Sequence, residues 1–141
     1  MLHEIGFGIS HSSHHKHSYY IIRNSEHMVG FNFEELEVIA LTARYHRKSP
    51  PKPKHIEFNN ISELNQSVVR KLAGILRIAD GLDRSHQGIV EDISCELQND
   101  LVIFKVKTKQ GVDPHIDVWS AQQKRDLFEE VYNKKTAFVI L

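Results

Sequence analysis

Residues 30–49 read GFNFEELEVIALTARYHRKS, and this stretch contains a helix start, a helix body and the signal that ends the helix. Asn32 occupies an N-cap position, and Glu35 follows three residues later, as in a capping box. Apolar residues then recur at helical spacing, and His46 falls on the same inward side. The prolines that begin at Pro50 cannot continue a helix. We therefore expect an amphipathic helix that carries a histidine toward the core.

The segments before and after this helix are also predicted to be helical. Ser12 or Ser13 is placed to cap a helix over residues 14–25, and Asn60 is placed to cap a long helix with two rows of apolar residues. Asp80 lies at the end of one row, where an unpaired carboxylate is unfavourable. Asp80 therefore requires a cation, a metal or a set of donors.

From Gly88 the pattern changes to that of strands. Two segments alternate at period two on either side of Asn99 and Asp100, which predicts a β-hairpin. Residues 119–134 predict a helix, and residues 136–141 predict a last short strand.

The predicted fold class is therefore α+β. We expect a mainly helical domain over residues 1–87, followed by a small α+β subdomain with the β-hairpin over residues 88–141. The segment LHEIGFG, residues 2–8, has the pattern of the last turn of a helix that glycine stops. This pattern predicts that the first helix is truncated and that the chain is a fragment of a longer protein.

Composition limits the classes of partner. The formal net charge of the 141 residues is zero, which does not support a specific nucleic-acid partner. The single cysteine, Cys95, excludes an internal disulfide and fits a reducing compartment, so we expect a cytoplasmic protein. Because it falls in a predicted strand, we expect Cys95 in the core. No apolar run approaches the roughly 18 residues of a membrane span, so no membrane partner is expected.

A histidine-rich run precedes the first complete helix. Within ISHSSHHKHSYY, residues 9–20, four histidines and Lys16 fall in seven positions. If His14 begins a helix, these cations lie at the positive end of its dipole, which opposes them by up to about 1 kcal/mol per charge. Proteins accept this arrangement where an anion binds. The run is either the start of an anion site or an ordinary polar first turn.

A second basic segment is ARYHRKSPPKPKH, residues 43–55, which contains five arginines and lysines and no acid. Arginine pairs with phosphate oxygens through two parallel hydrogen bonds, and lysine supplies a point charge. The alternative is a solvated basic loop. Two such segments in a small domain favour a shared surface for a polyanion. Its predicted ligands are His14, His15, Lys16, Arg44, Arg47, Lys48, Lys52 and Lys54.

Four residues from separate segments suit a divalent metal that prefers nitrogen and oxygen donors: His3, His17, His46 and Asp80. The alternative for Asp80 is an ion pair with Arg77 or Arg84, which lie on the same helical face.

Five stretches, taken in order, resemble the C-terminal HD-like domain of the exopolyphosphatase/guanosine pentaphosphate phosphohydrolase (Ppx/GppA) family: LHEIG, ISHSSHHKHSYYIIRN, GFNFEELEVIALTARYHRKS, PKH and LRIADGLDRSH. The resemblance runs from residue 2 to about residue 86, and the KHSYY and ARYHRK segments are its most specific parts. The α+β tail resembles the end of the family more loosely.

The resemblance implies a function for the parent protein. Full-length members carry two N-terminal actin-like lobes, which use magnesium to release the terminal phosphate of inorganic polyphosphate or to hydrolyse guanosine pentaphosphate. Their HD-like domain helps to form a basic channel for the polyanion, often at a homodimer interface. Neither lobe is present in this chain, so we expect a polyanion-binding and dimerisation domain without phosphatase activity of its own.

HD-like domains are in turn similar to HD-type metal phosphohydrolases. In that comparison His3 and Glu4 correspond to the adjacent His-Asp pair, and Asp80 to the later aspartate. His17 and His46 correspond to additional metal-binding histidines of the related cyclic-dinucleotide hydrolases. The resemblance therefore leaves two alternatives: a metal-dependent phosphohydrolase, with Glu4 as ligand or base, and a purely structural module.

Overall fold

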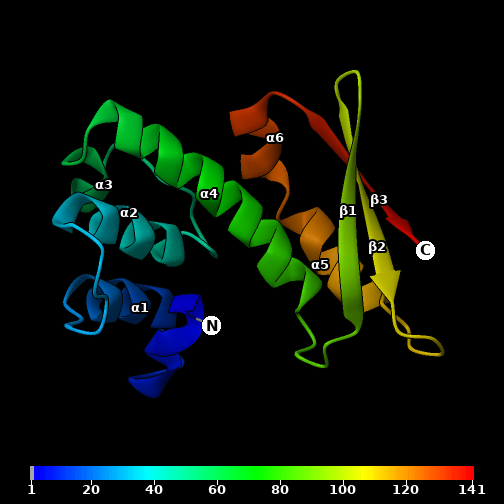
Figure 1. Cartoon of the computed structure of the whole chain (residues 1–141), viewed down its shortest axis with the longest axis horizontal. Helices are drawn as coiled ribbons and strands as arrows, with labels where there is room; N and C mark the ends of the chain where they lie inside the picture. The colour runs from blue at the N-terminus through cyan, green and yellow to red at the C-terminus, as the bar shows by residue number, and fades with distance from the viewer. Residues whose placement is uncertain (1) are drawn as a thin grey trace. The chain divides into compact units, whose positions relative to one another are not determined.

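The computed structural model describes residues 2–141, which divide into two compact units. One unit ends at Leu76, and the other runs from Arg77 to Leu141, so the division falls inside helix α4 (Glu63–Leu82). Helices make up the first unit, and a three-stranded sheet with helices makes up the second (Figure 1). This confirms the α+β class. The predicted domain boundary between residues 87 and 88 stays a prediction.

The first unit is built around a helical hairpin. The 3₁₀ helix η1 (Leu2–Gly8) and helix α2 (Phe33–Arg44) both pack against helix α1 (His14–Arg23), and the short helix α3 (Ile56–Asn59) precedes α4 (Figure 1). The helical hairpin closes on a core of Ile22, Ala40 and Ala43, where the two alanines allow the helices to approach closely.

Hydrogen bonds to the side chain of Glu37 link α1 to α2. This carboxylate of α2 is only 6% exposed, and it accepts a hydrogen bond from the Tyr19 hydroxyl and one from Nε of Arg23, each 2.6 Å long. Burial raises the pKa of Tyr19, and the bond to Glu37 raises it further, so the hydroxyl keeps its proton. Hydrogen bonds to a charged group are about twice as strong as neutral ones. The pair of bonds therefore sets how the two helices align.

The helix starts follow the sequence prediction at α2 and depart from it at α4. Oδ1 of Asn32 accepts from the Glu35 N–H at 3.0 Å, and Oε2 of Glu35 accepts from the Asn32 N–H at 2.8 Å, so the capping box is confirmed. The prediction that Asn60 caps α4 was wrong, because Asn60 follows the last residue of α3. The hydroxyl of Ser62 accepts from the Asn65 N–H instead.

A close backbone approach seats η1 on α1. Ser18 is fully buried; its hydroxyl donates to the His3 carbonyl at 2.8 Å and accepts from the Gly6 N–H at 2.9 Å. A Cβ at position 6 would lie 2.6 Å from the backbone nitrogen of Ser18, closer than any side chain tolerates. Gly6 was predicted to stop a helix, which was wrong, because η1 continues to Gly8. Gly6 instead allows η1 to touch α1.

The second unit contains strands β1 (Val90–Gln98), β2 (Leu101–Thr108) and β3 (Lys135–Ile140), in the order β1-β2-β3. β1 and β2 are antiparallel around Asn99 and Asp100, which confirms the hairpin, and β3 runs parallel to β2. The predicted helix over residues 119–134 is divided in two, α5 (His115–Gln123) and α6 (Asp126–Tyr132).

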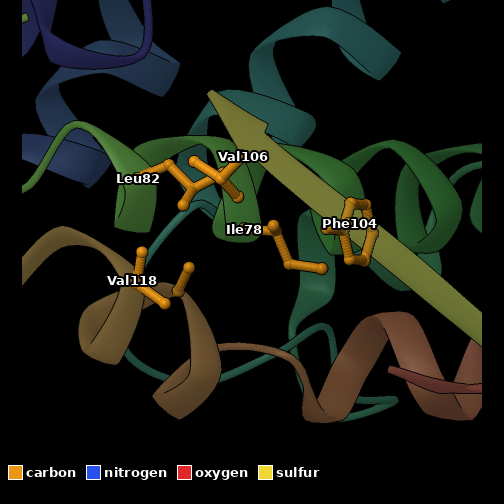
Figure 2. Close-up of a cluster of buried hydrophobic side chains, with 6 residues drawn as sticks. Ile78, Leu82, Phe104, Val106 and Val118 are labelled. Carbon is orange, nitrogen blue, oxygen red and sulfur yellow. The ribbon is translucent and has the colours of Figure 1, made fainter. Parts of the chain in front are cut away.

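The core of this unit joins the end of α4, strand β2 and helix α5. Figure 2 shows the cluster, in which Ile78 and Leu82 meet Phe104, Val106 and Val118. Each of these side chains is less than a tenth exposed. In residues 2–141 we find no helix with the length and apolar character that crossing a membrane requires.

The prediction that Cys95 is a core residue was wrong, because Cys95 is exposed. Cys95 lies opposite buried Phe104 in the antiparallel ladder. Its side chain is therefore on the same face of the sheet as Phe104, as the alternation predicted. β1 is an edge strand, however, and the buried cluster is centred on β2. Period-two alternation predicts a face of a sheet and does not predict whether that face is covered.

Replacing Gly6 with alanine should destabilise the first unit by about 1–3 kcal/mol, because the new Cβ forces η1 away from α1. Gly8→Ala is the matched control, because no atom of residues 2–141 beyond its two chain neighbours lies within 4 Å of a Cβ at that position. Urea denaturation followed by circular dichroism measures both variants. Equal stability of the two variants would contradict the close approach at Gly6.

Candidate anion-binding pocket

Helix α1 begins without the side-chain cap that the sequence predicted. Ser13 occupies the N-cap position, but its backbone is left-handed, with a φ of 57°, and its hydroxyl makes no capping hydrogen bond. The first N–H groups of an α-helix have no partner inside the helix, and they carry the positive end of its dipole. The start of α1 is therefore suited to an anion.

A pocket of about 320 Å³ opens at this helix start, within the first unit. It forms because the first turn of α1 lies beside the residues that follow α2, where Nε2 of His14 is 3.2 Å from Nε2 of His46. The lining side chains come from these two places and from the loop before α3: Ser13, His15, Lys16, Arg44, Tyr45, Lys48, Ser49 and His55.

Three cations predicted as polyanion ligands line this pocket: Lys16, Arg44 and Lys48. Arg44 is held in place, because it pairs with Glu57 at 2.9 Å and its guanidinium lies 5.5 Å from the centre of the Tyr19 ring. Burial alone would raise the pKa of Glu57, but a backbone hydrogen bond and Arg44 lower it below its ordinary value. Glu57 therefore stays ionised and orients Arg44 in the pocket wall.

His15 is the buried residue of the pocket. Its side chain is 7% exposed, and its Nδ1 has no hydrogen-bond partner among residues 2–141. Burial, together with the nearby charges of Arg47 and Lys48, lowers the pKa of His15 to about 4. The imidazole is therefore neutral at pH 7. A buried polar atom without a partner is unfavourable by about 1–3 kcal/mol, unless a ligand completes its hydrogen bond.

Tyr45 and His55 form an aromatic wall. Their rings stack with centroids 5.5 Å apart, and the Tyr45 hydroxyl lies 2.8 Å from Nδ1 of His55. Burial raises the pKa of Tyr45 to about 12, so its hydroxyl keeps the proton. The backbone N–H of Lys52 can only donate, and it points at the same Nδ1. Nδ1 is therefore the acceptor, and the proton of neutral His55 lies on Nε2.

Arg47 and His14, both predicted as polyanion ligands, bond to each other outside this lining. Nη1 of Arg47 lies 3.2 Å from Nδ1 of His14, and Nδ1 of His46 lies 2.6 Å from the carbonyl oxygen of Ala43. A guanidinium only donates and a carbonyl only accepts. His14 therefore carries its proton on Nε2 and donates it to Nε2 of His46, so Arg47 orients two buried imidazoles.

The remaining predicted anion ligands, Lys52 and Lys54, are exposed on the loop before α3 and do not line the pocket. Four of the lining residues were not among the predicted ligands: Ser13, Tyr45, Ser49 and His55. Tyr45 and His55 lie inside the basic segment, where only the cations were considered. Their closeness to His15 depends on the packing of α1 against α2.

The predicted metal ligands of the first unit lie around η1. His3 and His46 are buried, with ring centroids 4.8 Å apart. His17 is partly buried on α1. Burial lowers the pKa of His14, and the Glu4 carboxylate on η1 partly opposes this shift. His14 therefore belongs to this group, although the sequence analysis assigned it to the anion surface.

Asp80, the fifth predicted metal ligand, belongs to the second unit. Its carboxylate accepts a hydrogen bond and forms an ion pair with Lys124 of the segment between α5 and α6. Burial lowers the pKa of partly buried Arg77, and Asp126 and Asp80 partly oppose this shift. The structure therefore supplies the partner that the burial of Asp80 requires. The role of Asp80 as a metal ligand stays a prediction.

Comparison with known families identifies the chain. A model of the Ppx/GppA phosphatase domain III matches residues 1–130, which is most of the 141 residues. The chain belongs to the Ppx/GppA phosphatase family. This result confirms the resemblance that the histidine run and the basic segment carried.

A curated relative supports the family assignment. The Ppx/GppA chain is 41% identical over 78 residues to a guanosine-5'-triphosphate,3'-diphosphate pyrophosphatase of Pseudoalteromonas translucida. The matched stretch covers 55% of this chain and 15% of the relative. The chain therefore spans only a small part of the length of that relative.

Replacing His15 with leucine should stabilise this Ppx/GppA domain by about 1 kcal/mol, because the substitution removes a buried Nδ1 that has no protein partner. His14→Leu is the matched control. His14 is equally buried but is bonded to Arg47 and His46, so its loss should destabilise the domain. Urea denaturation in the presence of a chelator measures both. A destabilised His15→Leu variant would show that the imidazole is satisfied in the protein itself.

Proposed function

We propose that this Ppx/GppA domain binds chains of phosphate groups for a longer phosphohydrolase, at the pocket beside the start of α1. The observation that carries the proposal is the convergence of Lys16, Arg44 and Lys48 on an uncapped helix start, next to buried His15. A helix start alone is a weak signal. Its combination with three cations and an unpartnered buried imidazole favours a multiply charged anion.

The chemistry of the lining fits phosphate in particular. The eight lining side chains include no acid, so nothing in the lining repels an anion. Lys16 and Lys48 offer point charges, and Arg44 offers a planar set of donors. The hydroxyls of Ser13 and Ser49 can donate hydrogen bonds to phosphate oxygens.

Inorganic polyphosphate and guanosine pentaphosphate are the two candidate ligands. Both carry consecutive phosphate groups, which the cations and hydroxyl groups of this pocket are suited to bind. The name of the relative from Pseudoalteromonas translucida includes guanosine-5'-triphosphate,3'-diphosphate. This name supports guanosine pentaphosphate as the ligand. The pocket volume of about 320 Å³ admits several phosphates of either ligand.

The parent protein completes the proposal. By resemblance to the family, two N-terminal actin-like lobes hold the magnesium-dependent phosphatase site, and the whole protein works in the cytoplasm. The small share of the relative that the matched stretch covers supports a longer parent. In this arrangement the domain retains the polyanion while the lobes hydrolyse it, and residues 1–141 alone should release no phosphate.

The double variant Lys16→Gln with Lys48→Gln should weaken tripolyphosphate binding at least about tenfold, because each charge-assisted hydrogen bond contributes about 1.5–3 kcal/mol. Lys52→Gln with Lys54→Gln is the matched control, since it removes the same charge from exposed positions outside the lining. Isothermal titration calorimetry measures both. A fourfold increase in salt should weaken binding to the unaltered chain by roughly tenfold.

Equal losses in the two double variants would contradict the pocket and favour a diffuse basic surface. Parallel titrations with guanosine pentaphosphate and with tripolyphosphate separate the candidate ligands. A tighter nucleotide complex would assign the domain to guanosine pentaphosphate, and equal affinities would assign it to the phosphate chain alone.

We also propose that the domain forms a homodimer through α4. One apolar row of this helix is outward: Leu64 is 75% exposed, Leu72 is 42% exposed and Ile75 is 47% exposed. The neighbouring row, with Val69 and Ala73, is fully buried. An exposed apolar stripe with helical spacing is typical of a helix that packs against another protein surface.

Leu72→Gln with Ile75→Gln should therefore convert a dimer into a monomer, because it removes apolar area from the proposed interface. Val29→Gln, at an 85% exposed position in the loop before α2, is the control that should leave the dimer intact. Sedimentation equilibrium gives the mass of each species. A monomeric unaltered chain would exclude self-association of this domain.

A further inference from the structure

An apolar groove of about 310 Å³ lies in the first unit, and the proposed phosphate pocket does not use it. The groove opens between the start of α2 and the first half of α4. Half of its eight lining side chains are apolar: Phe31, Val38, Ile39 and Val68. Accessible apolar surface of this kind marks a site for a ligand or for another protein.

The chemistry of the groove disfavours a second phosphate site. Its other lining side chains are two carboxylates, Glu34 and Glu35, and two asparagine amides, and the lining contains no cation. Carboxylates repel phosphate groups by their like charge. A volume of about 310 Å³ is at the lower end of the range for small-molecule sites. The groove is therefore better suited to a few apolar side chains of a protein.

The groove is continuous with the exposed apolar stripe of α4 that was proposed above as the dimer contact, which consists of Leu64, Leu72 and Ile75. Val68 lies four residues after Leu64 and four residues before Leu72. Residues four positions apart lie on the same face of an α-helix. Val68 therefore belongs both to the row of the stripe and to the lining of the groove, so the two features form one surface.

The stripe alone is too small for a stable dimer. A standard protein interface involves roughly 20–30 residues of each partner. The stripe offers three exposed apolar side chains, so the surface beside it must contribute to the contact. The groove is an apolar hollow next to the stripe, and it brings the start of α2 into the interface.

A homodimer contact must also be complementary to itself. Around a two-fold axis the same patch meets its own copy, so that residue i contacts residue j and residue j contacts residue i. A stripe that is only convex meets this requirement poorly, because stable interfaces are closely packed. A stripe with a groove beside it meets the requirement, since the stripe of each copy can enter the groove of the other.

We propose that Leu72 of a second copy fills this groove, with the two α4 helices antiparallel around the two-fold axis. The inference rests on the proposed homodimer and names the surface that receives the stripe. The middle of the stripe lies between Val68 and Leu72. An axis at that point brings Leu72 of each copy level with Val68 of the other copy, in the wall of the groove.

Phe31→Gln should raise the dimer dissociation constant of residues 1–141 at least about tenfold, because it removes apolar area from the groove, although Phe31 lies outside α4. Phe33→Gln is the matched control. Phe33 is more exposed than Phe31, at 64% against 48%, but it does not line the groove. Sedimentation equilibrium measures both constants, and circular dichroism checks that both variants keep their helices.

A pair of introduced cysteines tests the contact in the folded protein. Cys95 is first replaced with serine, because its exposed thiol would form disulfides of its own. Val38→Cys chains mixed with Leu72→Cys chains should then form a mixed disulfide under mild oxidation, since a disulfide requires Cα atoms within about 7 Å of each other. Val29→Cys chains mixed with Leu72→Cys chains should form none, because Val29 is exposed outside the groove.

The two experiments separate the contact at the groove from the homodimer itself. A dimer that Phe31→Gln and Phe33→Gln affect equally, or that forms no mixed disulfide between positions 38 and 72, would overturn the contact at the groove and leave the dimer through α4 in place. A monomeric unaltered chain would overturn both the homodimer and the contact at the groove.

Discussion

The buried carboxylate of Glu37 is the contact on which the first unit depends. It receives hydrogen bonds from Tyr19 and Arg23 and so aligns α1 with α2. With that alignment the first turn of α1 lies beside the residues that follow α2. Both groups of functional side chains are built at this one junction. A shift by one helical turn, about 5.4 Å, would separate His14 from His46 and would take Lys16 away from Arg44.

Adjacent histidines are directed to different surroundings by ordinary helix geometry. Successive residues of an α-helix point about 100° apart. His14 therefore stacks on Phe7 and faces His46, while His15 lines the pocket with Lys16. His14 and His15 were predicted to lie on the same surface because they belong to one basic run. The composition of a run does not show that the two histidines have different surroundings, whereas the direction of each side chain on the helix does.

The pocket contains several locally unfavourable features. Ser13 and Lys48 both have left-handed backbone conformations, and Nδ1 of His15 is buried without a partner in the described chain. Such features are found where function requires them, and the surrounding structure must hold them in place. Here the capping box of α2, the bonds to Glu37 and the close approach at Gly6 supply that stability.

The sequence by itself determined the family, the start of α2 and the β-hairpin, because these depend on residues that are close together along the chain. Only the tertiary structure decided which charged and aromatic side chains share a pocket. His14 and His46 are 32 positions apart, and Asp80 and Lys124 are 44 positions apart. No local pattern encodes such pairings. They follow from how the helices pack, which is set by buried contacts such as Glu37 and by the absence of a side chain at Gly6.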